Sequence, residues 1–106
     1  MDKKFNTYQL HLKEKALKNG VSDGKTLEFQ FENHDDILQL VDLVKSKELF
    51  KKQTDNVEFL VGLKLFSEVM LRNRDHEMFT EFGPEFGIFM KKFKSYVKMA
   101  KTVEQT

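Results

Sequence analysis

Two segments near the start of the chain alternate between apolar and polar residues. Within residues 5–12 and 26–32, the apolar residues that alternate with polar ones are Tyr8, Leu10, Leu12, Leu27, Phe29 and Phe31. A period of two is typical of a β-strand with one buried face. The segment between them carries two turn dipeptides, Asn-Gly at 19–20 and Asp-Gly at 23–24. The pattern therefore predicts an antiparallel β-hairpin.

After residue 33 the apolar residues recur every three or four positions, which is the spacing of a helix. This spacing predicts helices over about 34–47, 55–73 and 84–101, with a short helical turn over 75–82. Asn33 is expected to cap the first helix, Thr54 or Asp55 the second, and Pro84 to take the first position of the last. The middle helix has apolar residues around most of its circumference, which predicts a central helix packed on two sides. Gly62 within it is expected to let a neighbouring element approach closely.

The element order predicts an α+β fold: an N-terminal antiparallel hairpin followed by three to four helices. With 106 residues the chain suits one domain. We expect that domain to span residues 1–101, with a frayed tail over residues 102–106. Of the 11 phenylalanines, seven to nine are expected to converge on one core that includes the hairpin. Phe5 and Phe50 are left over and are the candidate interface residues.

Composition and charge narrow the classes of function. The absence of Cys excludes disulfides, zinc–cysteine sites and thiol catalysis. No apolar run approaches the roughly 20 residues that cross a membrane, and no signal-peptide pattern is visible, so we expect a cytoplasmic protein. A net charge of +1 argues against a dedicated nucleic-acid binder.

Charge is nevertheless uneven along the chain, with acidic residues concentrated over 26–42 and lysines over 84–106. The simpler interpretation is that both charged segments form solvent-exposed faces. The more specific interpretation is that the two segments are complementary between subunits, or that the lysines form an electropositive face for a ligand. Weak nucleic-acid binding is therefore an alternative function. Its phosphate contacts would be Lys91, Lys92, Lys94 and Lys98.

No arrangement of residues points to a specific catalytic chemistry. His34 beside Asp35 and Asp36 is the best local candidate for a metal or acid–base site, but adjacent helical residues point in different directions. Helix capping also accounts for the acidic pair. No catalytic residue, metal or cofactor is assigned, and an enzyme with a site around these three residues is kept as a second alternative.

Four stretches of the chain together resemble a known family. They are HL at 11–12, FQFENHDD at 29–36, VGLKLFSEVML at 61–71 and FGPEFGIFMKK at 82–92. They are similar to a family of small bacterial proteins catalogued only as a domain of unknown function, over about residues 5–95. The resemblance implies an α+β fold and a bacterial cytoplasmic setting, and it brings no activity, cofactor or catalytic residue. Its polar positions form a candidate functional surface: Asn33, His34, Asp35, Asp36, Lys64 and Glu68.

The expected function is non-catalytic association, by self-association or by binding a partner protein whose identity the sequence leaves open. A two-stranded sheet is marginal alone, and its open edges are sites for pairing with another chain. We therefore expect a homodimer, formed through these edges or through Phe-rich helix surface.

Overall fold

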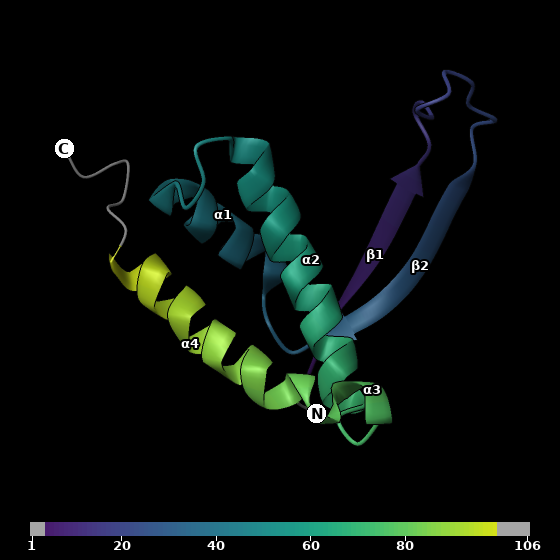
Figure 1. Ribbon diagram of the computed structural model, residues 1–106. Coiled ribbons are helices and arrows are strands. Elements are labelled where there is room, and N and C mark those ends of the chain that lie inside the picture. The colour runs from purple at the N-terminus through teal and green to yellow at the C-terminus, as the bar shows by residue number, and fades with distance from the viewer. Residues whose placement is uncertain (1–3, 100–106) are drawn as a thin grey trace. The chain divides into compact units, whose positions relative to one another are not determined.

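The structure is a computed structural model that describes residues 4–99, and it contains a two-stranded hairpin followed by four helices (Figure 1). The elements are β1 (Asn6–Lys13), β2 (Thr26–Asn33), α1 (Ile37–Lys47), α2 (Gln53–Arg72), α3 (Glu77–Thr80) and α4 (Phe82–Met99). This order confirms the predicted α+β fold class. The chain divides into two compact units, residues 1–35 with the hairpin and residues 36–106 with the helices. The expected extent of one domain stays a prediction, and the expected tail lies outside the described residues.

The hairpin has the register that its alternating pattern predicts. Tyr8 pairs with Phe31, Leu10 with Phe29 and Leu12 with Leu27, so all six apolar side chains lie on one face of the sheet. We call these six residues the apolar hairpin face. The pairs between them, such as Gln9 with Gln30, place polar residues on the other face.

A carboxylate holds the loop that joins the two strands. Glu14 Oε1 accepts hydrogen bonds from Ser22 Oγ at 2.9 Å and from the backbone N–H of Asp23 at 3.0 Å. Gly20 and Gly24 have φ angles of 87° and 73°, in the left-handed region that glycine adopts without strain. Asn19-Gly20 therefore lies in a turn, as predicted, closed by the Gly20 N–H on the Leu17 carbonyl oxygen at 2.8 Å, whereas Asp23-Gly24 lies in an irregular segment that no such backbone bond closes.

Helix α1 begins three residues later than the pattern predicts. Its N-cap is Asp36, whose Oδ1 accepts the backbone N–H of Gln39 at 3.1 Å, so the expected capping role of Asn33 is wrong. The Asn33 side chain instead accepts the backbone N–H of Asp35 at 3.0 Å, which closes a turn before the helix. The predicted apolar stripe is confirmed, since Ile37, Val41 and Val44 are buried.

Helices α2 and α4, by contrast, begin two residues earlier than predicted. Lys52 is the N-cap of α2 and makes no side-chain cap bond, so Thr54 and Asp55 lie in the first turn rather than at the cap. Pro84 is the third residue of α4 rather than its first. It is tolerated there because backbone N–H groups of the first turn have no intrahelical partner.

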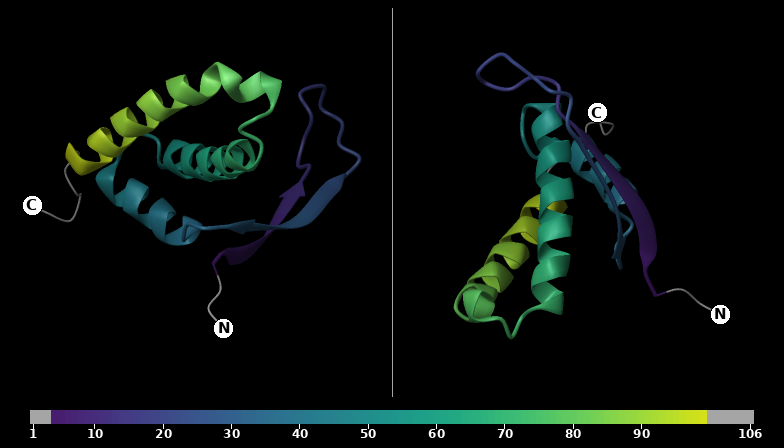
Figure 2. Two further views of the ribbon diagram at one scale, coloured as in Figure 1. Left: turned by 90° about the horizontal axis from the view of Figure 1, so that it is seen from below. Right: turned by 90° about the vertical axis from the view of Figure 1, so that its right-hand side faces the viewer.

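Within the helical unit, α1 packs on α2, and α3 joins the end of α2 to the start of α4, so that the two long helices run in opposite directions (Figure 2). The core between α2 and α4 contains buried Leu63, Met70 and Phe86. Four partly buried side chains pack against them: Phe59, Phe79, Met90 and Phe93. Helix α2 thus contacts helices on two sides, as predicted.

Within each unit the phenylalanines contact one another. Phe29 contacts Phe31, and Phe31 contacts Tyr8, at ring-centroid distances of 5.8 and 5.5 Å within the hairpin. The helical phenylalanines form a second network of ring contacts, made by Phe50, Phe59, Phe66, Phe79, Phe82, Phe86, Phe89 and Phe93. The expectation of a single core that includes the hairpin stays a prediction, because periodicity identifies the apolar face of an element but not the element that covers it.

Candidate functional site

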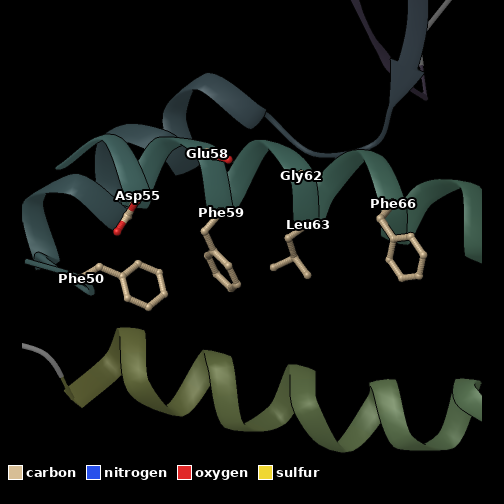
Figure 3. A pocket seen from close by; sticks show the side chains of 7 residues that line it. All are labelled: Phe50, Asp55, Glu58, Phe59, Gly62, Leu63 and Phe66. Carbon is tan, nitrogen blue, oxygen red and sulfur yellow. The ribbon is translucent and has the colours of Figure 1, made fainter. Parts of the chain in front are cut away.

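An apolar pocket of about 540 Å³ lies on the side of α2 that faces α4 (Figure 3). Its lining residues are Phe50, Asp55, Glu58, Phe59, Gly62, Leu63 and Phe66. Six of the seven belong to α2, at spacings of three or four residues that place them on one face of the helix. Phe59, Leu63 and Phe66 point from α2 toward α4.

Phe50 is the one lining residue outside α2, and the side chain of Asn56 holds its backbone in place. Asn56 Oδ1 accepts the backbone N–H of Phe50 at 2.8 Å, and Nδ2 donates to the Phe50 carbonyl oxygen at 3.1 Å and to Gln53 Oε1 at 2.9 Å. Asn56 is fully buried. The loop before α2 is therefore tied to the helix, and the Phe50 ring packs edge to face on Phe59 at 5.3 Å.

A second pocket of about 240 Å³ adjoins the first across these two rings. Its lining residues are Leu49, Phe50, Phe59, Phe89, Lys92, Phe93 and Tyr96. Phe50 and Phe59 line both pockets, and we call the two neighbouring pockets together the α2–α4 groove. Asp55, Glu58 and Lys92 are the charged residues among its lining. A surface that is almost wholly aromatic and aliphatic, with charges at its margins, is suited to binding rather than to proton or group transfer.

The candidate residues after β2 are largely accounted for by the turn that they form. The Asp35 carbonyl oxygen accepts hydrogen bonds from Asn6 Nδ2 at 3.0 Å and from the Tyr8 hydroxyl at 2.9 Å. His34 Nε2 lies 3.6 Å from Asp35 Oδ1, and 52% of the His34 side chain is exposed. A functional role for Asn33, His34, Asp35 and Asp36 stays a prediction.

The other candidate residues are spread over several elements. Glu68 is buried and Lys64 half-buried on α2, and both have interaction partners. Phe5 is exposed before β1, and Phe50 lies in the groove. The four lysines proposed for phosphate contact are exposed on α4, and one of them lines the groove: Lys91, Lys92, Lys94 and Lys98.

The described residues contain neither a metal-binding cluster nor a membrane-spanning helix. Residues 4–99 contain no group of three or more His, Asp or Glu side chains placed to hold a metal ion. In the same part of the chain, none of the helices has the length and apolar character to cross a membrane.

Sequence reasoning missed most of the groove. The sequence makes Phe50 a candidate because it fits no predicted core, whereas it gives Asn56, Asp55 and Glu58 no predicted role in a site. A signal for Asn56 was present, because it is a polar residue four positions before Leu60 on the buried side of α2. Burial of an amide at such a position requires hydrogen-bond partners, which here are supplied by a loop.

Gly62 does not make the close approach that we expected. Apart from the adjoining residues and backbone of its own helix, a side-chain Cβ at Gly62 would meet no atom within 4 Å, because the residue opens onto the groove. Substitution of Gly62 by alanine is therefore expected to raise the free energy of unfolding by about 0.5–1 kcal/mol, since glycine costs that much inside a helix. Chemical denaturation of the two proteins measures this change, and a decrease would mean that the site is more crowded than the structure shows.

Comparison with known proteins gives a family and a fold. A family model described as a domain of unknown function with a solved structure matches residues 6–95. The crystal structure of a protein of unknown function from Pectobacterium atrosepticum is similar, with 38% sequence identity and a TM-score of 0.76 over 86% of this chain and 98% of that one. No curated protein matches the chain. These findings confirm the expected resemblance and the hairpin-and-helices fold.

Proposed function

The chain belongs to the DUF3861 family, a domain of unknown function, and for this member we propose a non-catalytic function in self-association as a homodimer. The observation that carries the proposal is the apolar hairpin face. The sheet has two strands and forms one layer. A sheet with an apolar face is stable when a second layer covers that face.

The exposure of this face supports the proposal. Leu12 is 61% exposed, Leu27 54% and Phe29 39%. Leu12 and Leu27 are direct cross-strand partners, so together they form a continuous aliphatic patch toward the loop end of the hairpin. Exposed apolar side chains grouped in this way are typical of a surface that another protein layer covers.

The chemistry of the face favours a second copy of the chain as that layer. All six residues of the apolar hairpin face are uncharged. Two identical faces can therefore meet about a twofold axis without opposing like charges, as an isologous interface requires. The result would be two hairpins packed face to face, the arrangement of a small β-sandwich.

Sedimentation equilibrium at micromolar concentration tests the homodimer, with an expected mass of twice that of one chain. The double variant Leu12→Thr and Leu27→Thr keeps residues that favour strands but removes apolar area. It is expected to weaken the dimer at least about 10-fold, because each buried leucine contributes about 1.5–3 kcal/mol.

The matched control is Gln9→Thr with Gln30→Thr, a cross-strand pair on the opposite face of the same strands. It is expected to leave the dimer unchanged. A monomeric wild-type protein would overturn the proposal. Equal weakening by both double variants would show that the apolar hairpin face is not the interface.

The other expectations from the sequence stay predictions. They are phosphate binding by Lys91, Lys92, Lys94 and Lys98, an enzyme site around His34, Asp35 and Asp36, bacterial origin and cytoplasmic localisation. For phosphate binding, a salt titration decides, because affinity that does not fall between about 50 and 200 mM salt cannot rest on phosphate contacts.

A further inference from the structure

We propose that the α2–α4 groove is a docking site for an amphipathic helix of another protein, one that carries lysine or arginine beside its apolar face. This proposal concerns a partner other than a second copy and a surface separate from the apolar hairpin face. It rests on the shape, the exposed aromatic side chains and the charges of the groove.

The groove has the shape of a helix site. Its residues on α2 extend from Asp55 to Phe66, about 16 Å at 1.5 Å per residue, or three helical turns. The pocket along this stretch is open rather than enclosed, whereas sites for small molecules bury most of the ligand surface. An open apolar groove of this length matches a partner helix that inserts side chains at positions i, i+4 and i+7.

Aromatic side chains in the groove are held in place but remain partly uncovered. Phe50 is 39% exposed and Phe66 43% exposed. Phe50 packs on Phe59, and Phe66 packs on Phe86 at a ring-centroid distance of 5.8 Å. The backbone of Phe50 is fixed by Asn56. Such pre-positioned aromatic side chains lose little conformational entropy when a partner covers them, and they are frequent hot spots of interfaces.

The charges at the first pocket favour a cationic partner. Asp55 and Glu58 lie three residues apart on α2, and neither forms an ion pair with another residue in the described part of the chain, 4–99. Lys92 lines the second pocket, beyond the Phe50–Phe59 pair. The whole chain has a net charge of +1. Its overall charge therefore does not attract a basic peptide. A preference for one would have to come from these two carboxylates.

Gly62 gives the proposal a specific test. It lines the groove, and its missing side chain leaves open space that no part of the described chain fills. Gly62→Leu would place a bulky side chain where the partner helix is proposed to lie. Gly87 supplies the matched control, because it is also exposed on a helix with open space around it but lines neither pocket.

The experiment uses the full chain and two synthetic helical peptides of about 18 residues, or five turns. Both carry leucines at the same helical positions, with lysine at the polar positions of one and glutamate at those of the other. Fluorescence anisotropy at physiological salt measures their binding. The lysine peptide is expected to bind at least about 10-fold more tightly than the glutamate peptide.

Three variants assign the binding to the groove. Gly62→Leu is expected to weaken binding of the lysine peptide at least about 10-fold, and Gly87→Leu to leave it unchanged. Asp55→Asn with Glu58→Gln is expected to remove most of the difference between the peptides. Light scattering on each variant records its oligomeric state, so loss of the dimer is distinguished from loss of peptide binding.

Three results would overturn the proposal. One is no binding of either peptide, and another is equal affinity for both peptides in the wild-type protein. The third is equal loss of binding in Gly62→Leu and Gly87→Leu, which would show that the peptide does not lie in the groove.

Discussion

Substitution of Asn56 by alanine is expected to lower the free energy of unfolding by about 2–4 kcal/mol, because the N–H and C=O groups of Phe50 would lose their partner and an unsatisfied buried polar group costs about 1–3 kcal/mol. The Asn56 side chain is fully buried and supplies a hydrogen bond to each of these groups. For a chain of this size the loss corresponds to a fall in Tm of roughly 10–20 °C. Thermal and chemical denaturation followed by circular dichroism measure it.

Asn73→Ala is the matched control for this prediction. Asn73 lies at the other end of α2, and its Nδ2 donates to the Val69 carbonyl oxygen at 2.7 Å in an exposed position. Water can replace that bond, so the expected change is within about 0.5 kcal/mol. Equal destabilisation by the two substitutions would contradict the anchoring of Phe50 by Asn56. The variant Asn56→Ala should also weaken peptide binding in the groove, since it releases Phe50.

Substitution of Leu60 by alanine is expected to lower the free energy of unfolding by about 2–5 kcal/mol. Leu60 is 0% exposed and lies on α2, which packs against α1. Truncation of such a side chain removes buried apolar area and leaves a cavity that the surrounding helices fill only in part. Urea denaturation measures the change from the shift of the midpoint at an unchanged slope.

Leu71→Ala on the same helix is the control for the cavity. Leu71 is 52% exposed, so truncation removes little buried area. We expect a loss below about 1 kcal/mol. If Leu60→Ala were no more destabilising than Leu71→Ala, the packing of α1 on α2 would be less close than the structure shows.

The pairing of the strands was predictable from the sequence because successive side chains of a strand point to opposite faces of the sheet. Alternation with a period of two assigns Tyr8, Leu10 and Leu12 to one face, and the structure pairs each of them with an apolar residue of β2. The helix starts were less accurate. Asn33 and Asp36 are both good capping residues, and the choice between them depended on which backbone N–H each side chain reaches.

The groove was hardly predictable, because its lining comes from separate parts of the chain. Phe59 and Phe66 were assigned to a core by their spacing, yet Phe66 is partly exposed beside an open pocket. The sequence predicts a close approach of another element at Gly62, but the structure leaves its surroundings open. Helical spacing predicts which side of α2 is apolar, and it carries no information on how fully α4 covers that side.

The sequence by itself determined the order of the elements, the two faces of the hairpin and the buried stripe of α1, because these depend on the spacing of residues along one strand or one helix. Only the tertiary structure decided that Asn56 holds Phe50, that phenylalanines of α2 and α4 contact one another, and that α2 and α4 leave a groove between them. These features depend on distances between side chains of different elements. Local periodicity does not encode such distances, and the packing of the whole chain sets them.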